Sequence, residues 1–510
     1  MNYKEILNGY RDEISCVLSE LVSFESVKTG PADGKPFGEA IHRAYSYMLA
    51  KAKGDGFDTF DVDGYGGHIE WLGAVTDERG EIVSAADETL GAIAHLDVSP
   101  AGDGWGHDPW ACETVGGRIY GRGTADGKGA AVAVYYAMKA LKESGFLPAR
   151  NMRLILGLDA ETGWSGLEKY LAGTTAPDFC FTPDAEFPVI NGGMGILVFE
   201  IAKKLETSNE NGLHLRSMKG GGAPDMVPDQ CRAILTFEDG VESKAGKARR
   251  KSKAGQAGKG KDLRGKAFAL VKEAAADYRR RSGGKLSCKG VGNSLEVLAQ
   301  GIPAPGAGHR KGVNAISILV DFLGSLPIVN ESARDFLDFC RNHIGFETDG
   351  KGLGIQMSDR LSGPLILNAG MIRVSRGAAV LTVNVRYPLS KKEDDVYKAL
   401  RPILGEKGLG VVKKSGAAPF YLPPDDFLVK TLMEAYRDNT GDEESPPKVG
   451  GGDTCARAFP RAVAFGPRFP REEGAGRQKD EYISLDSLMS AAQIYADALC
   501  RLCEKSLSQV

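Results

Sequence analysis

Three short apolar runs that each end in an aspartate constrain the fold of this chain more than any other feature. They are LGAIAHLD (90–97), MRLILGLD (152–159) and FCFTPD (179–184), and each has the length and composition of a buried strand. Between the first two, KGAAVAVYYAMKALKESG (128–145) has helical spacing and ends near Gly145. Strands and helices that alternate in this order predict an α/β fold with a mostly parallel sheet and helices on both of its faces.

The chain has 510 residues, which is too long for one simple core, so we expect two or more domains. Apolar residues recur at helical spacing over 3–24 and again over 485–502, which predicts a helix near each end. The middle, about 191–385, has shorter elements separated by turn residues. Within it, residues 243–266 hold ten Lys or Arg against one Asp. Such a segment cannot bury a core, so we expect a solvated, mobile loop there.

The composition argues against several classes of protein. Hydrophobic residues make up 42% of the chain and charged residues 26%, as in a soluble globular protein. The formal charge of −3 argues against a general binder of nucleic acid or anionic membranes. The basic run lacks interleaved aromatic residues, so it does not favour nucleic-acid binding either. No run approaches the ~20 apolar residues of a membrane span. Nine scattered cysteines resemble the reduced thiols of a cytoplasmic protein.

Acidic residues and one histidine gather where the predicted strands end, which is where open α/β sheets place their sites. His95 and Asp97 point the same way along a strand, so the carboxylate can orient the imidazole. Asp126 lies in a tight loop before a helix, and Glu161 and Asp184 follow the other two strands. Taken singly, each has an ordinary explanation: a core histidine, a helix-capping aspartate or a solvated acid. Together, in this order, they predict a site for a divalent metal ion.

Longer motifs run through the whole chain. They are HLDVSPAGDGW, GRGTADGKG, PDAEFPVINGGMG, DMVPD, GVNAI, NVRYP and VAFGPRFP…DEYI. With them the sequence resembles the dipeptidase-V branch of the metallopeptidase family that includes aminoacylase, carboxypeptidase G and carnosinase. The resemblance implies a zinc-peptidase-like catalytic domain made of residues 1–190 and 386–510, with an inserted α+β lid domain over 191–385. It also implies hydrolysis of dipeptides that have a free N-terminus.

The resemblance assigns roles to the residues at the strand ends. His95, Asp126 and Asp184 match the ligands of a first metal ion, and Asp126 also bridges to a second. Glu161 matches a ligand of that second ion. Asp97 matches the carboxylate that orients His95. The ion implied is zinc or manganese, since histidine and carboxylate ligands suit both.

Two positions near this site depart from the family pattern. Relatives have a glutamate as general base where this chain has Ala160, and a methyl group cannot accept a proton. Loss of a general base costs ~10²–10⁴-fold in rate. Relatives have a metal-binding histidine where this chain has Arg477, and a guanidinium does not ligate metals. Both changes bear on the chemistry that the family performs.

The inserted domain keeps one expected residue and changes two. Arg386, in NVRYP, matches the arginine that binds the substrate carboxylate, a task that suits a planar guanidinium. Pro305 stands where relatives have a histidine that stabilises the oxyanion, and His309 lies four positions later. Asp225, in DMVPD, replaces an asparagine and turns a partner of the substrate carboxylate into a repulsive group.

The substitution to Arg477 has a physical interpretation. Without a second ion, Glu161 and Asp126 are crowded like charges, and a guanidinium could pair with Glu161 in the place of the missing cation. We therefore expect one metal ion per chain, on His95, Asp126 and Asp184.

Three functions remain open from the sequence. The first is a metal-dependent dipeptidase that acts on small peptides as a monomer. The second is a catalytically inactive homologue that binds a small peptide or amino-acid derivative. The third is a protein whose fold serves assembly alone.

Overall fold

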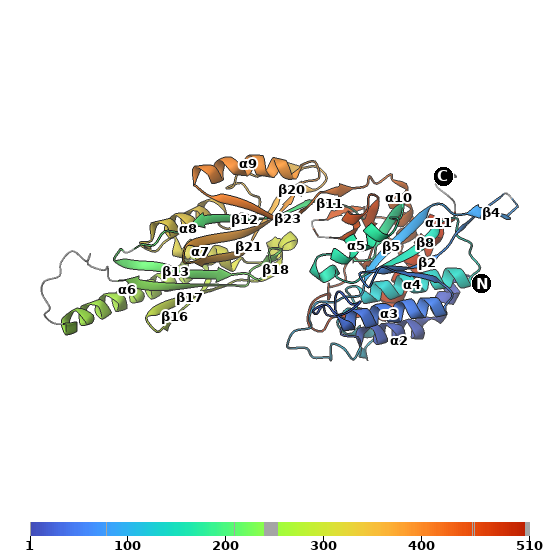
Figure 1. Ribbon diagram of the computed structural model, residues 1–510, viewed down its shortest axis with the longest axis horizontal. Helices are drawn as coiled ribbons and strands as arrows, with labels where there is room; N and C mark the ends of the chain where they lie inside the picture. The colour runs from blue at the N-terminus through green and yellow to red at the C-terminus, as the bar shows by residue number, and fades with distance from the viewer. Residues whose placement is uncertain are drawn as a thin grey trace. The chain divides into compact units, whose positions relative to one another are not determined.

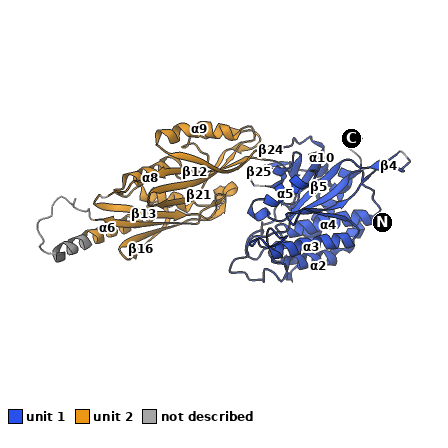
Figure 2. Cartoon of the chain, in the orientation of Figure 1, with its two compact units in different colours: residues 1–192, 421–510 blue, residues 193–420 orange. Residues whose placement is uncertain are grey.

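The structure is a computed structural model that describes residues 2–77, 79–208, 210–238, 253–450, 452 and 454–504, of which 253–262 are described by their backbone. The chain forms two compact units (Figure 2). Unit 1 contains residues 1–192 and 421–510, and unit 2 contains residues 193–420. Unit 2 is therefore an insertion into the chain of unit 1.

A mixed nine-stranded sheet forms the centre of unit 1, in the order β1-β2-β8-β5-β9-β26-β11-β24, with β25 beside β11. The four central strands β8, β5, β9 and β26 run parallel, whereas β1, β2 and β11 pair antiparallel with their neighbours. Their bounds are β1 (Asp58–Asp61), β2 (Gly67–Trp71), β5 (Thr89–His95), β8 (Asn151–Gly157), β9 (Phe179–Thr182), β11 (Ile190–Gly193), β24 (Phe420–Tyr421), β25 (Lys448–Gly450) and β26 (Ala462–Ala464).

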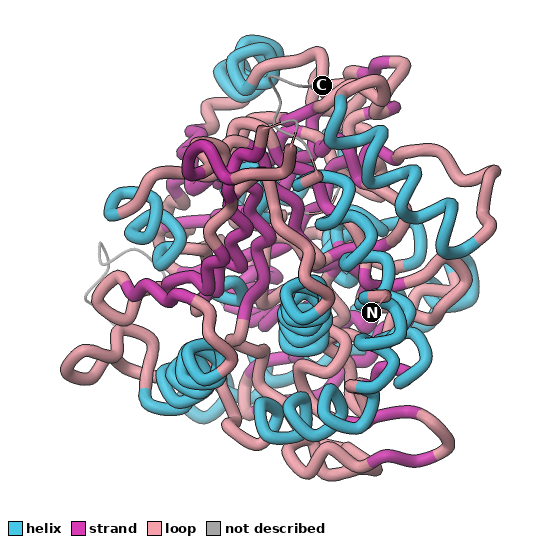
Figure 3. The backbone as a smooth tube through the Cα atoms, turned by 90° about the vertical axis from the view of Figure 1, so that its right-hand side faces the viewer, coloured by secondary structure: helices cyan, strands magenta, loops and turns pink. Residues whose placement is uncertain are grey.

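Helices enclose this sheet (Figures 1 and 3). Nearly every residue of α4 is buried, because its small and apolar side chains pack against β5, β8 and α11. Helix α5 contacts the sheet through the Tyr170 hydroxyl, 2.8 Å from His68 Nδ1 in β2. The helices of unit 1 are α1 (Tyr3–Gly9), α2 (Arg11–Val22), α3 (Glu39–Gly54), α4 (Lys128–Glu143), α5 (Ser165–Gly173), α10 (Phe427–Thr440) and α11 (Leu485–Cys503).

Short strands complete unit 1. They form the pairs β3 (Ala74–Thr76) with β4 (Ile82–Ala85) and β10 (Ala185–Glu186) with β27 (Pro467–Arg468), and the set β6 (Thr114–Val115), β7 (Arg118–Tyr120) and β28 (Tyr482–Ser484). Since β28 pairs with β7, the segment before α11 lies beside the segment before α4.

Unit 2 is built on an eight-stranded antiparallel sheet in the order β16-β17-β15-β13-β21-β22-β12-β23. Helices α6 (Lys253–Ser282), α7 (Ala315–Leu323), α8 (Glu331–His343) and α9 (Glu393–Glu406) contribute apolar residues to one core with this sheet. The strands are β12 (Gly195–Lys204), β13 (Gly212–Gly220), β15 (Gln230–Glu238), β16 (Lys285–Val291), β17 (Ser294–Gln300), β21 (Ile366–Ser375), β22 (Ala378–Tyr387) and β23 (Gly410–Ala417), with the short pairs β14 (Met226–Val227) with β18 (Ala304–Pro305) and β19 (Ser358–Asp359) with β20 (Gly363–Pro364).

The predicted α/β class is confirmed, and the parallel part of the sheet is its four central strands. Over the described ranges, no helix has the length and apolar character needed to cross a membrane. Two details differ from the sequence prediction. The second boundary, predicted at 385/386, lies at 420/421, because β22 runs through the predicted position and β23 pairs with β12.

The expected loop over 243–266 is the second difference. Residues 253–266 instead form the first part of α6, while 243–252 lie outside the described residues. The helix is anchored further along, where Val271, Ala275 and Tyr278 are buried in the core of unit 2. Lysine, arginine and alanine have good helix propensities, so the anchored helix extends back into the basic segment.

Candidate metal centre

Three side chains of unit 1 converge at the carboxyl ends of its parallel strands. His95 is the last residue of β5, and Asp184 follows the neighbouring strand β9. Asp126 lies in the turn before α4, where Gly127 has φ 98°. Because neighbouring parallel strands end at the same sheet edge, residues far apart in the sequence meet here.

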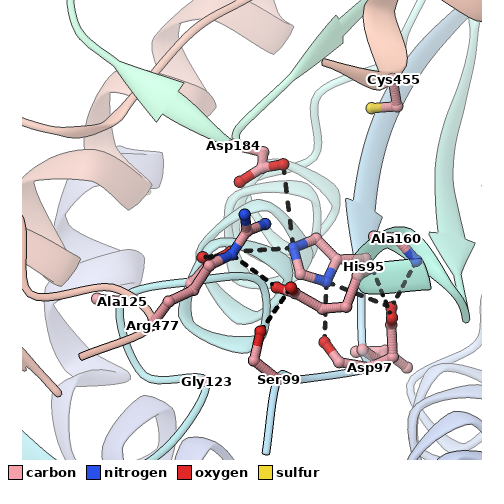
Figure 4. A network of polar contacts seen from close by, with 12 residues as sticks. His95, Asp97, Ser99, Gly123, Ala125, Ala160, Asp184, Cys455 and Arg477 are labelled. Carbon is pink, nitrogen blue, oxygen red and sulfur yellow. Dashed lines mark hydrogen bonds and ion pairs between the residues drawn. The ribbon is translucent and has the colours of Figure 1, made fainter. Parts of the chain in front are cut away.

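The geometry of these three residues suits a metal ion. One ligand atom from each of His95, Asp126 and Asp184 lies within 4.8 Å of the others. His95 Nε2 is 3.3 Å from Asp126 Oδ1 and 4.0 Å from Asp184 Oδ2 (Figure 4). Both His95 Nε2 and Asp126 Oδ1 are buried without a well-formed hydrogen bond to any described residue. Buried polar atoms are normally satisfied, so these converging atoms fit a divalent cation.

The electrostatics of the centre also favour a cation. Burial by itself lowers the pKa of His95, but the carboxylates of Asp126 and Asp97 outweigh it, and this pKa lies well above 6.5. Burial raises the pKa of Asp184 to about 6, and the charge of Asp126 adds to the rise. Without a metal ion the site therefore holds a proton, which an ion must displace. Ion binding is consequently favoured as the pH rises.

Asp97 supports two parts of the centre at once. His95 Nδ1 is 2.9 Å from the Asp97 carbonyl oxygen and 3.4 Å from its Oδ1. The carboxylate also accepts hydrogen bonds from the backbone N–H groups of Ala160 and Glu161, at 3.0 and 2.9 Å. The predicted contact with His95 is therefore accompanied by a second one, which fixes the turn that carries Ala160 and Glu161.

Arg477 lies between two carboxylates of this centre (Figure 4). Its Nε donates to Glu161 Oε1 at 2.9 Å and is 2.8 Å from Asp126 Oδ2. The other Glu161 oxygen, Oε2, accepts a hydrogen bond of 2.6 Å from the Ser99 hydroxyl. The structure thus contains the expected Arg477–Glu161 pair and adds Asp126 to it. The Arg477 guanidinium thus places one positive charge between the carboxylates of Glu161 and Asp126.

Glu481, which was not predicted as a site residue, links the turn of Asp126 to the segment of Arg477. It is fully buried. Its Oε1 accepts the backbone N–H groups of Gly123, Ala125 and Asp126 at 3.0–3.1 Å. Its Oε2 accepts from Arg122 Nη1 at 2.6 Å and from the Arg477 N–H at 3.3 Å. One carboxylate therefore holds both the turn of Asp126 and the segment of Arg477.

The other predicted site residues lie in unit 2. Arg386 is in β22, opposite Ile366 of β21, and is 5% exposed. Pro305, in β18, pairs with Met226 of β14, so it lies beside Asp225. The Gly306 N–H donates to the Asp225 carbonyl oxygen at 2.6 Å. Unit 2 therefore brings the exposed residues Asp225 and Pro305 together at the short β14-β18 pair, whereas Arg386 lies on β22 of the eight-stranded sheet.

Two residues of the site that were not predicted, Ser99 and Glu481, lie within motifs that are visible in the sequence. Ser99 follows Asp97 by two residues in HLDVSP, and Glu481 belongs to DEYI, so both stood in motifs already noted. Their roles depend on contacts between segments far apart in the chain: Glu481 contacts the turn of Asp126 across more than 350 residues. No local pattern specifies such a contact.

Comparison with known proteins identifies the family. The sequence matches Peptidase family M20/M25/M40 over residues 91–501. A Beta-Ala-Xaa dipeptidase of Lactobacillus delbrueckii subsp. lactis is 32% identical over 506 residues, which cover 98% of each chain. The chain belongs to this peptidase family. The resemblance inferred from the sequence motifs is thereby confirmed.

Solved structures support the fold of this peptidase-family chain. Human carnosine dipeptidase 1 is similar with a TM-score of 0.56 at 16% identity, covering 98% of both chains. An aminoacylhistidine dipeptidase from Vibrio alginolyticus is similar with a TM-score of 0.51 at 15% identity, covering 96% of both chains. At these identities the likeness concerns the fold.

Proposed function

We propose that this peptidase-family protein is a metal-dependent dipeptidase that works with a single divalent ion, zinc or manganese, on His95, Asp126 and Asp184. One observation carries the single ion: the Arg477 guanidinium lies within 3 Å of both Asp126 and Glu161. A second ion would need those same two carboxylates. The dipeptidase activity is supported by the relative named above, which carries that activity in its name.

A divalent ion, when bound, acts as a Lewis acid on a peptide carbonyl and lowers the pKa of water. Asp126 and Asp184 hold it, and Asp97 orients His95 and the turn at Ala160. Ala160 offers no proton acceptor, so we expect turnover ~10²–10⁴-fold below that of a relative with a glutamate there. Arg386 is proposed to bind the substrate carboxylate, which Asp225 opposes.

The test combines metal analysis with hydrolysis of a panel of unblocked dipeptides in zinc or manganese. We expect one ion per chain and slow turnover that chelator abolishes. Asp126→Ala should lose both the ion and the turnover. Asp425→Ala removes an exposed aspartate of the same unit and is the matched control. Two ions bound to the unmodified protein, or none, would contradict the single-ion site.

A second candidate is peptide binding without turnover, and Ala160 is the observation that favours it. In that case the metal-loaded protein binds dipeptides, measured by calorimetry, but does not cleave them. The double variant Ala160→Glu with Arg477→His should then restore cleavage, because it supplies a base and a second metal ligand. Slow, chelator-sensitive cleavage by the unmodified protein would exclude this candidate.

The proposal includes a cytoplasmic monomer. All nine cysteines lie in the described part of the chain and are free thiols. Six of them are buried, which suits a reducing compartment. Sedimentation of the purified protein would test the monomer, and fractionation of cells that produce it would test the location.

A further inference from the structure

Arg477 is held in place by the same carboxylate that holds the metal-binding turn. Its backbone has φ 62°, in the left-handed region that residues with a Cβ seldom adopt. Its N–H donates to Glu481 Oε2, and Glu481 Oε1 binds the N–H of Asp126. The position of Arg477 relative to Asp126 is therefore fixed through one buried side chain. Residues in uncommon backbone conformations gather at functional sites.

The guanidinium uses a single nitrogen for its two acidic neighbours. Both the 2.9 Å hydrogen bond to Glu161 and the 2.8 Å contact with Asp126 involve Nε. The terminal nitrogens Nη1 and Nη2 carry four further N–H donors. Within the described ranges, no residue accepts a hydrogen bond from them.

These terminal nitrogens are the part of the guanidinium that remains available to a ligand. In Figure 4 they lie on the side of the guanidinium that is turned toward Asp184. The side chain remains 55% exposed, so a ligand can reach it. Asp184 itself is not paired with Arg477, although their charges interact. The carboxylates of Glu161 and Asp126, which contact Nε, fix the plane of the guanidinium in the absence of a ligand.

We infer that the Arg477 terminal amino groups form an oxyanion-binding site beside the metal position, which takes a ligand oxygen bearing a full negative charge. The inference rests on the proposed single-ion function and deepens it. A preorganised donor pair in a partly enclosed site stabilises developing negative charge without reorganisation. Arg477 would touch the reacting oxygen and thus serve as a catalytic residue for a tetrahedral oxyanion.

The probe is a phosphinic analogue of a dipeptide, whose phosphinate oxygen is a fixed oxyanion. The hydroxyethylene isostere of the same dipeptide carries no charge and is the matched ligand. Calorimetry on the manganese-loaded protein gives both affinities. The test variant is Arg477→Gln with Glu161→Gln, which replaces the charged pair of terminal amino groups by one shorter, neutral amide and keeps the local charge balanced. Glu161→Gln alone, which retains Arg477, is the control variant.

We expect the double variant to bind the phosphinate about 10- to 100-fold more weakly, as for lost hydrogen bonds to a charged group. Affinity for the hydroxyethylene isostere should change less than about threefold, and Glu161→Gln alone should leave the preference for phosphinate intact. Metal content, measured separately, should stay at one ion per chain in all three proteins. This readout does not depend on turnover.

The outcomes separate the two proposals. Equal phosphinate affinity in the unmodified protein and the double variant, with one ion in each, overturns the oxyanion site and leaves the single-ion site standing. If the unmodified protein holds its ion but does not bind the phosphinate, the oxyanion site is likewise overturned and the single-ion site stands. Absence of a bound ion in the unmodified protein overturns the proposed function, and the oxyanion site with it.

Discussion

Replacement of Glu481 is the sharpest test of how this site is held together. Glu481→Ala removes the acceptor of three backbone N–H groups, from Gly123, Ala125 and Asp126. It also removes the carboxylate partner of Arg122, which is 2% exposed. An unpaired buried charge costs ~3–5 kcal/mol and each unsatisfied buried N–H ~1–3 kcal/mol. Since the surrounding structure can relax, we expect a loss of at least ~5 kcal/mol, less than the sum of these costs and still a large part of the stability of one domain.

The location of the tryptophans makes this loss measurable in unit 1 alone. All four, at positions 71, 105, 110 and 164, belong to that unit. Their fluorescence during urea unfolding of the metal-free protein therefore follows unit 1, whereas far-ultraviolet circular dichroism follows both units. We expect the fluorescence transition to move to lower urea and the part of the dichroism transition due to unit 2 to stay.

Two further variants make the measurement quantitative. Glu481→Gln keeps an acceptor oxygen and loses the charge, so we expect a smaller cost of ~2 kcal/mol. Asp438→Asn breaks an exposed pair with Arg501 of the same unit and should cost less than ~0.5 kcal/mol. If Glu481→Ala lowered the free energy of unfolding of unit 1 by less than ~1 kcal/mol, the reasoning from buried, satisfied groups would be refuted.

Two other predictions concern unit 1. Gly127 has φ 98°, and a Cβ added there lies 2.6 Å from His95 Cε1, so Gly127→Ala should weaken manganese binding at least tenfold. The control is Gly145→Ala, where φ is 83° and the space around the new Cβ is open, so that only backbone strain is added. Equal effects of the two variants on manganese affinity would contradict a clash with His95. Burial lowers the pKa of His68 to about 3. Below pH 6.5 this imidazole is therefore protonated in the unfolded chain but stays neutral in the folded chain. The contribution of His68 to the free energy of unfolding is thus fully present above pH 6.5 and is lost as the pH falls towards 3. Between pH 6.5 and 4.5 the free energy of unfolding falls by ~2 kcal/mol from this group. His68→Gln should flatten this part of the pH profile of urea unfolding, and an unchanged slope would disprove the assignment.

The sequence predicted the central layer of unit 1 well, because that layer depends on local patterns. The runs 90–97, 152–159 and 179–184 became β5, β8 and β9 within two residues at each end. Each strand is apolar on both faces, since helices cover both, and that composition is visible in the sequence. The ends of two of these strands carry His95 and Asp184, and the structure brings one ligand atom of each within 4.8 Å of one from Asp126.

Features that depend on distant contacts could not be predicted in this way. The domain boundary was misplaced because β22 carries the NVRYP motif yet pairs with β12, which lies about 180 residues earlier. The start of α6 was missed because its anchor lies downstream of the basic residues. The role of Glu481 arises from a turn near residue 125 and a segment near residue 477 that meet only in the folded chain.

The insertion of unit 2 into unit 1 also sets the order of events during synthesis. Strand β26 occupies a place between β9 and β11, and α11 packs on α4, yet both emerge after roughly 230 residues of unit 2. At ~5–20 residues per second, the ribosome needs about 10–50 s to make that insertion. For that time the first part of unit 1 exposes an apolar strand edge and an uncovered helix face. The first part of unit 1 is therefore open to aggregation until the last segment of the chain arrives.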